Sequence, residues 1–114
     1  MHGPPTNVLP GTLDLLILKA LSLGRLHGYA VLLRVQQITQ GGLAIEQGAL
    51  YPALYRLERQ GYVAGAWGQS DTQRKVKFYE NTPAGRQRLR EQTAAWNRMV
   101  DIMGAALRSR ASEV

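Results

Sequence analysis

The chain has 114 residues, a hydrophobic fraction of 45% and a formal net charge of +6, with an isoelectric point near 10.2. That length and apolar content support one packed domain, and the lack of cysteine excludes a disulfide scaffold. The positive balance indicates a polyanionic partner, either nucleic acid or an anionic membrane surface, with ordinary solubility charge as the alternative.

The two ends of the chain differ from its middle. Residues 1–10 hold three of the five prolines, and residues 110–114 are polar, so both are predicted to be flexible tails. The apolar stretch 13–23 is too short to span a bilayer and contains polar residues. Because no secretion signal is recognised at the N-terminus, we expect a cytoplasmic protein with no membrane partner.

Two helices are predicted in the first third of the chain. The first covers 12–23, with Thr12 as its N-cap and Gly24 as its stop, and its apolar residues fall on more than one side. It is therefore expected at the centre of the core. The second covers 29–40 and is ended by the pair of glycines that follows. Its inward-facing residues are predicted to be Tyr29, Leu32, Leu33 and Ile38.

A third helix is predicted over 47–60. Gly61 favours the left-handed conformation that ends a helix, and the one proline inside the span lies near its start, where a missing amide costs little. One face is a buried line of Leu50, Leu54 and Leu57, with Ala53 beside it. The opposite face is polar, aromatic and basic, and consists of Gln47, Gly48, Tyr51, Tyr55, Arg56 and Arg59.

A hairpin is predicted after the third helix. Its strands cover 62–67 and 76–81, and the polar loop 68–75 between them is too long for a tight turn. A brief strand is also predicted over 43–45, between the second and third helices.

Thr82 and Pro83 open a long last helix, as N-cap and first helical residue, which continues to about Ser109. Its apolar residues recur at intervals of seven and form one stripe on a helix that leaves the folded domain. Packing against its own domain is the alternative for the start of the stripe, and beyond Trp96 a homodimer is the better interpretation. The predicted dimerisation residues are Leu89, Trp96, Met99, Val100, Met103 and Leu107.

Residues suited to catalysis or metal binding are few. The two histidines, His2 and His27, have no partner at metal-ligand spacing, no glycine-rich phosphate loop follows a strand, and the eight carboxylates are scattered. His27 lies in a turn, where it is better interpreted as a cap for a neighbouring backbone group. We therefore predict no metal site, no cofactor and no enzymatic activity.

The start of the third helix favours double-stranded DNA as the partner. Gln47 can hydrogen-bond a base edge, and Tyr51 can reach a phosphate, a sugar or a thymine methyl. Gly48 and Ala49 leave the helix slim enough to enter a groove, and its free amides favour a phosphate. A solvated helix face without acids is the alternative.

The hairpin and the end of the third helix add positive charge. Lys75 and its neighbours suit phosphate or minor-groove contact, with a solvated charge run as the alternative. Two arginines one turn apart can meet phosphates, although Arg59 also suits the dipole at the helix end. The predicted DNA-binding residues are Gln47, Gly48, Ala49, Tyr51, Tyr55, Arg56, Arg59, Arg74, Lys75 and Lys77.

Three segments resemble the PadR family of bacterial transcriptional regulators: GTLDLLILKALSLGRLHGY (11–29), EQGALYPALYRLERQGYV (46–63) and KFYENTPAGRQRL (77–89). Their order and spacing match the family. The resemblance implies an α+β, mainly α fold, with a winged helix-turn-helix DNA-binding domain over 11–82 and a single dimerisation helix over 83–109. Such a protein represses transcription as a homodimer at promoter DNA and is associated with the nucleoid when bound.

The resemblance also implies roles for single residues. It assigns Tyr51 and the start of the third helix to the major groove, and Arg74, Lys75 and Lys77 to the wing. Some relatives release DNA when a small aromatic compound binds between paired tryptophans, and Trp96 has a suitable place for that, with a plain dimer-core role as the alternative. A module of another class, using the winged fold for protein interaction or ligand sensing without DNA, remains the rival interpretation.

Overall fold

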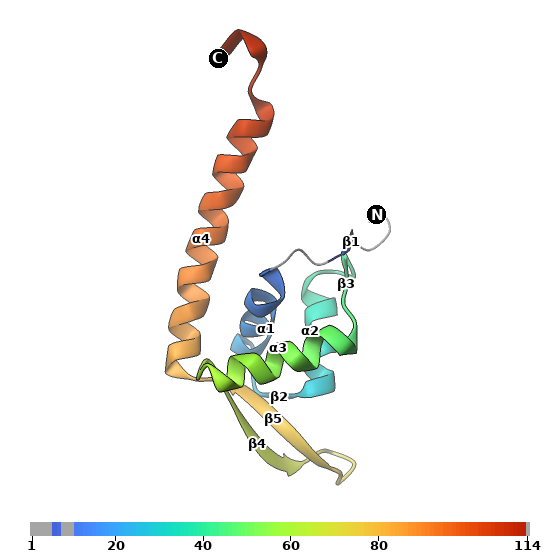
Figure 1. Ribbon diagram of the computed structural model, residues 1–114. Helices are drawn as coiled ribbons and strands as arrows, with labels where there is room; N and C mark the ends of the chain where they lie inside the picture. The colour runs from blue at the N-terminus through green and yellow to red at the C-terminus, as the bar shows by residue number, and fades with distance from the viewer. Residues whose placement is uncertain (1–5, 8–10, 114) are drawn as a thin grey trace.

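The computed structural model describes residues 6–7 and 11–113 of the chain. In chain order its elements are β1 (Thr6–Asn7), α1 (Thr12–Ser22), β2 (Leu26–His27), α2 (Gly28–Ile38), β3 (Leu43–Ala44), α3 (Gln47–Arg59), β4 (Val63–Gln69), β5 (Lys75–Asn81), α4 (Pro83–Arg108) and the short 3-10 turn η1 (Ala111–Glu113). The first three helices cluster beside a small sheet, and α4 extends away from them (Figure 1). The molecule is therefore elongated, with extents of 64 × 32 × 21 Å.

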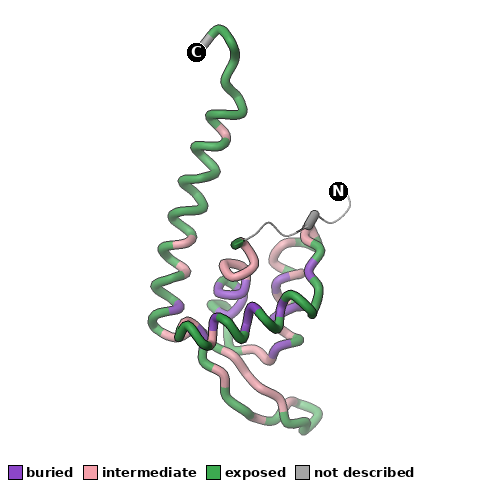
Figure 2. Tube along the Cα trace, viewed as in Figure 1, coloured by how far each residue is buried: buried purple, intermediate pink, exposed green. Residues whose placement is uncertain are grey.

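The hydrophobic core lies among α1, α2 and α3. Ile17, Val31, Leu50 and Leu54 are all 0% exposed. The predicted buried line of α3 is confirmed, and α1 contacts both other helices as well as β5 and α4. In Figure 2 the buried segments are concentrated in this cluster, while α4 is exposed along most of its length.

The start of α1 differs from the prediction. Its N-cap is Gly11, whose backbone is left-handed with φ of 84°, and Thr12 is the first helical residue rather than the cap. A left-handed φ suits glycine because it has no Cβ to collide with the backbone. The helix ends at Ser22, just before Gly24, as expected.

The buried face of α2 also differs from the prediction. Tyr29 and Leu33 were expected to face inward, but both are about half exposed. The helix starts at Gly28, and its buried residues are Gly28, Val31, Leu32 and Val35. Leu32 is buried as predicted, and Ile38 packs against the core. The buried face is centred closer to Gly28 because this glycine, rather than the larger Tyr29, lies against α3.

The sheet has the strand order β2-β5-β4, with antiparallel neighbours. The pairing of β4 with β5 runs from Val63 opposite Asn81 to Gln69 opposite Lys75. The strands are therefore longer than predicted, and the hairpin loop is only 70–74. A longer loop was predicted because residues 68–75 are mostly polar. Backbone hydrogen bonds do not depend on side-chain polarity, so β4 and β5 pair as far as Gln69 and Lys75.

The brief strand predicted over 43–45 is present as β3, and it pairs in parallel with β1. The other residues of the tail predicted over 1–10 lie outside the described part of the chain. At the opposite end, residues 111–113 form η1, and Val114 is not described.

The base of α4 is fixed to the domain by backbone contacts. The hydroxyl of Thr82 accepts a hydrogen bond from the Gly85 amide at 3.0 Å and donates to the Gly61 carbonyl at 2.6 Å, which confirms Thr82 as the N-cap. A Cβ on Gly85 would lie 1.9 Å from the carbonyl oxygen of Tyr62. Only glycine fits this contact, so the first turn of α4 rests directly on the chain that follows α3.

The rest of α4 leaves the domain. Leu89 packs against the core, but beyond Gln92 none of the described residues of this helix is buried. Together these elements form the predicted winged helix-turn-helix, mainly helical, with a long C-terminal helix.

Candidate nucleic-acid interface

The outward face of α3 is the first part of the candidate interface. Gln47, Gly48 and Ala49 are exposed at its start, and Tyr51 and Tyr55 are 42% and 61% exposed. This face is open because the leucines of α3 all turn the other way, into the core. The exposed face predicted for α3 is therefore confirmed, and its entry into a groove stays a prediction.

The start of α2 shapes the position of Tyr51. A Cβ on Gly28 would lie 2.5 Å from Cε1 of the Tyr51 ring, so the ring lies directly against the backbone of this glycine. The preceding His27 is the N-cap of α2, and its Nδ1 accepts a hydrogen bond from the Ala30 amide at 3.3 Å. The capping role predicted for His27 is confirmed, and Gly28 is explained as the residue that lets α3 approach α2.

The two arginines of α3 have different surroundings. The Arg56 guanidinium is hydrogen-bonded and ion-paired to the carboxylate of Asp14 on α1, and the two side chains are 51% and 33% exposed. Arg59 lies with its guanidinium carbon 6.0 Å from the centre of the Tyr55 ring. Arg56 thus links α3 to α1, which local sequence could not reveal because Asp14 lies in a different predicted helix.

The wing, which consists of β4, β5 and the loop 70–74 between them, forms the second part of the candidate interface. The register sets Trp67 opposite Lys77 and Gln69 opposite Lys75, so these side chains share one face of the sheet. Lys75 Nζ lies 5.3 Å from the centre of the Trp67 ring. Lys75 was expected near the tip of a long loop and is instead the first residue of β5.

Lys77 is held by α3. Its Nζ donates to the Glu58 carboxylate at 2.8 Å, and this hydrogen bond raises the pKa of Lys77 above its ordinary value. The side chain crosses β4 over Gly65, where a Cβ would lie 2.4 Å from Lys77 Cε. Lys77 therefore fixes the wing against α3, and Lys75 and Arg74 are the wing cations without a carboxylate partner among the described residues.

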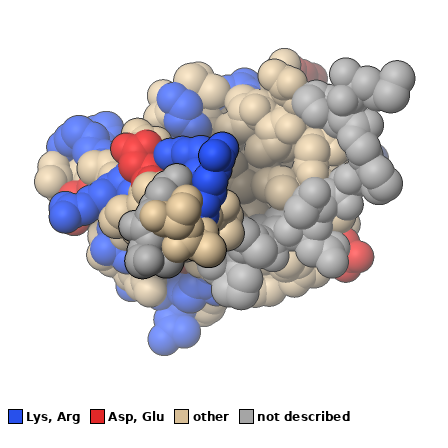
Figure 3. Space-filling model, turned by 90° about the horizontal axis from the view of Figure 1, so that it is seen from above, with Lys and Arg blue, Asp and Glu red and all other residues tan. Residues whose placement is uncertain are grey.

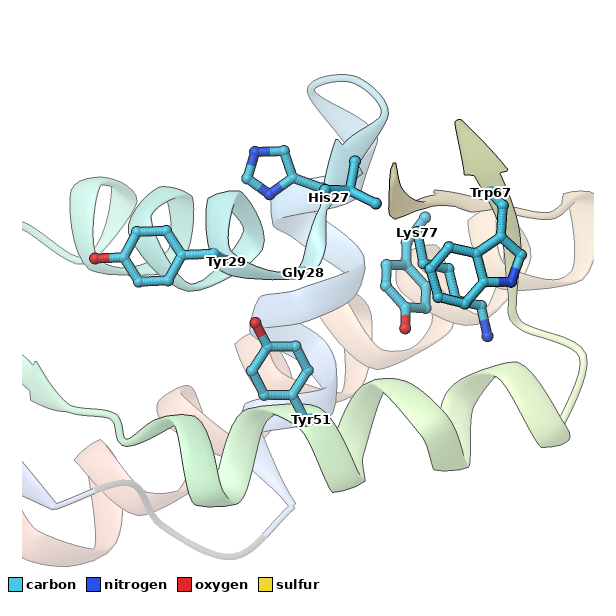
Figure 4. Close-up of a pocket in the computed structure, with 8 residues that line it drawn as sticks. His27, Gly28, Tyr29, Tyr51, Trp67 and Lys77 are labelled. Atoms are coloured by element: carbon cyan, nitrogen blue, oxygen red, sulfur yellow. The ribbon is translucent and has the colours of Figure 1, made fainter. Parts of the chain in front are cut away.

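A hollow of about 430 Å³ separates α3 from the wing. It is lined largely by aromatic side chains, among them His27, Tyr29, Tyr51, Trp67 and Tyr79, together with Lys77. In the close-up, Tyr51 points from α3 towards Gly28. Trp67 and Lys77 lie to one side of it and Tyr29 lies to the other (Figure 4). Tyr29 and Trp67 were not among the predicted interface residues, although the alternation of strand side chains could have assigned Trp67 to the face of Lys77.

Positive charge is not confined to α3 and the wing. Seen from above, Lys and Arg side chains gather on the side of the molecule where α4 stands (Figure 3). Arg86, Arg88 and Arg90 open that helix, and Arg88 lies 5.5 Å from the centre of the Tyr62 ring. The first turns of α4 therefore carry a further group of positive charges.

The apolar stripe of α4 is open to solvent. Trp96 is 44% exposed and Leu107 is 79% exposed, and Met99, Val100 and Met103 lie between these limits. At about 100° per residue these side chains fall on one face of the helix. Ile102 is also exposed but lies off this face.

Other chemistry finds little support in the described residues. No group of three or more His, Cys, Asp or Glu side chains could hold a metal ion there. Across the same residues, every helix falls short of the length and apolar character that a bilayer span requires.

A sequence model of the Transcriptional regulator PadR-like family matches residues 17–91. The chain belongs to this family. Its members are transcriptional regulators rather than enzymes, and the resemblance found from the sequence is confirmed. A PadR family transcriptional regulator from Eggerthella lenta is 35% identical, with a TM-score of 0.74, over 88% of this chain and 85% of that one.

Two further solved structures are similar. A transcriptional regulator from Clostridium thermocellum is 26% identical, with a TM-score of 0.75, over 83% of this chain and 92% of that one. Bacillus subtilis PadR, solved in complex with operator DNA, shares the fold at 24% identity and a TM-score of 0.64, over 72% of this chain and 46% of that one.

Proposed function

We propose that this PadR family regulator binds promoter DNA in the cytoplasm as a homodimer and represses transcription from it. The observation that carries the proposal is the juxtaposition of an open, acid-poor helix face with the wing cations across one hollow. The solved complex of Bacillus subtilis PadR with operator DNA supports a DNA partner for this fold.

In the proposed complex α3 reads the major groove and the wing holds the backbone. Gln47 bonds a base edge, and the hydroxyl of Tyr51 reaches a phosphate or sugar. Arg74 and Lys75 neutralise phosphates beside the groove, with Arg59 contributing from the end of α3. Arg56 and Lys77 contribute mainly by holding α3 and the wing in place, because each already has a carboxylate partner.

Dimerisation through α4 completes the proposal. The exposed stripe of this helix needs a cover, and a second copy supplies one of the same chemistry. The pair of α3 helices then reads two half-sites about 34 Å apart, which is one turn of the duplex. Repression follows when the two half-sites overlap a promoter.

Selection of bound duplexes from a random pool would identify the operator, and gel shifts over a salt series would then test each role. Arg74→Ala and Lys75→Ala should weaken binding to all duplexes and reduce the salt slope by about one each. Gln47→Ala should weaken the selected site by about tenfold and leave random duplexes unaffected, because it removes a base contact. Tyr51→Phe should weaken binding to all duplexes, because a phosphate or sugar contact does not depend on sequence. Arg110→Ala, at the far end of the chain, is the matched control.

The proposal fails if the protein binds no duplex at low salt, because a basic dimer with a DNA face retains non-specific affinity there. Release by a small aromatic effector at Trp96 has its own test. Quenching of tryptophan emission by planar aromatic compounds, lost in Trp96→Phe, would support it, and silence across a broad panel would leave Trp96 as a dimer-core residue.

A further inference from the structure

The aromatic hollow between α3 and the wing lies in the middle of the candidate interface. Trp67 is 64% exposed, and Tyr29 and Tyr51 beside it are each more than 40% exposed. Large aromatic rings are rarely left open together in water, since each buries 150–250 Å² when covered. The hollow therefore needs an occupant in the working state of the protein.

The charges around the hollow indicate what that occupant is. Lys75 lies 5.3 Å from the Trp67 ring, and Lys77 lies on the same face of the sheet. Within the described part of the chain, Glu58 is the one acid paired with these cations, and it is already bonded to Lys77. Exposed aromatic rings beside cations match a polymer that alternates phosphate anions with deoxyribose sugars, because the C–H face of the sugar can pack on an aromatic ring.

The position of the hollow agrees with that chemistry. Its walls are Trp67 of the wing on one side and Tyr29 of α2 on the other, with Tyr51 of α3 and Gly28 between them (Figure 4). A duplex that meets α3 in its major groove and the wing at its edge must carry one strand across this gap. An amide-rich helix start suits a phosphate in that strand.

We propose that the hollow is the seat of one sugar–phosphate strand of the bound duplex, with the Trp67 ring packed against a deoxyribose or an adjoining base. Tyr29 forms the opposite wall, and Lys75 binds the neighbouring phosphate. Trp67 and Tyr29 thereby join the DNA-binding residues. This inference rests on the proposed DNA-binding function and adds a specific contact to it.

The chain's two tryptophans make the contact measurable. Trp67 lies on the wing and Trp96 on α4, so titration of wild-type protein with its selected duplex should quench the emission of Trp67. The same titration of Trp67→Phe should leave the emission of the remaining Trp96 unchanged. Trp67→Ala should weaken duplex binding by about tenfold, the usual loss for one stacked base or sugar contact. Leu23→Ala, an exposed apolar residue at the end of α1, should bind as wild type.

The outcomes separate this proposal from the function on which it rests. If the protein binds no duplex at low salt, both the DNA-binding function and the strand seat are overturned. Tight duplex binding with unchanged emission and full affinity in Trp67→Ala overturns the strand seat and leaves DNA binding intact. Quenching of Trp67 by sodium benzoate in place of the duplex would assign the hollow to a small aromatic anion and also overturn it. Circular dichroism of Trp67→Phe checks that the fold is kept.

Discussion

The winged domain and α4 bury their apolar side chains in opposite ways. In the winged domain, Leu50 and Leu54 are 0% exposed, and the core is closed by three helices of the same chain. On α4, Trp96 and Met103 are nearly half exposed, and no described element covers them. The core of the domain is thus closed within one copy, whereas the apolar stripe on the outer part of α4 is uncovered.

From this difference we infer that the stability of each copy and the proposed dimerisation depend on separate sets of residues. A change in the core should alter unfolding of each copy, while a change on the α4 stripe should alter association. The contacts at Thr82 and Gly85 join the winged domain to α4.

The largest expected effect is in the core. Leu54→Ala should lower the free energy of unfolding by about 2–5 kcal/mol, because it removes fully buried methyl groups and leaves a cavity. Leu23→Ala, at a half-exposed position, should change it by less than about 0.5 kcal/mol. Urea unfolding followed by circular dichroism measures both. Equal losses in the two variants would contradict the assignment of the core to α1–α3.

The next effect is on association. Met103→Glu should weaken the proposed homodimer about 100-fold, since a carboxylate would be buried without a partner in its interface. Ala105→Glu adds the same charge about 200° around the helix and should leave the dimer intact. Sedimentation equilibrium distinguishes the two. A dimer that survives Met103→Glu would show that the stripe has another role.

Two glycines of α4 distinguish its attached base from its exposed outer part. Gly85→Ala should destabilise the protein by about 1–3 kcal/mol, because the new Cβ meets the Tyr62 backbone carbonyl. Gly104→Ala should stabilise α4 by up to about 1 kcal/mol, because only the flexible end of Arg108 lies nearby. Thermal unfolding of both variants gives the comparison. A stabilising Gly85→Ala would mean that α4 is not seated on the domain.

The smallest expected effect is a fall in the free energy of unfolding at alkaline pH, caused by two residues of the wing. Burial raises the pKa of Tyr79 above its ordinary value of 10.0, and the bond to Glu58 raises that of Lys77 above 10.5. Both protonated forms are favoured by folding, so their contribution is present below about pH 10 and is lost as the pH rises further. Urea unfolding at pH 8, 10 and 11 should show this loss, and it should be smaller in Tyr79→Phe. An equal loss in that variant would place the titration elsewhere.

Much of the fold could be predicted because it depends on local signals. Helical spacing identified α1, α3 and α4, Gly61 ended α3 in a left-handed conformation with φ of 82°, and Thr82 with Pro83 began α4. Each of these signals acts within a few residues of the chain. The exposed face of α3 was also correct, because its leucines define the opposite side.

The errors concern contacts between distant segments. Tyr29 was assigned to the core because its spacing matched, but only the crossing of α2 and α3 shows that Gly28 is the buried residue there. The partners of Arg56 and Lys77 are similarly distant, at Asp14 and Glu58. Local sequence gives the charge of a side chain, but only tertiary contacts show whether that charge is already paired with a carboxylate of the same chain.

The contact between Gly85 and Tyr62 has a consequence for the spacing of the two DNA half-sites. From Pro83, α4 reaches Leu107 after a rise of about 36 Å, so a tilt of about 10° at its base moves that end by about 6 Å. This displacement is close to two base-pair steps of about 3.4 Å each. In the proposed dimer, a contact too tight for a single added methyl group would therefore limit the tilt of α4 and hold the half-site spacing to within a base pair or two.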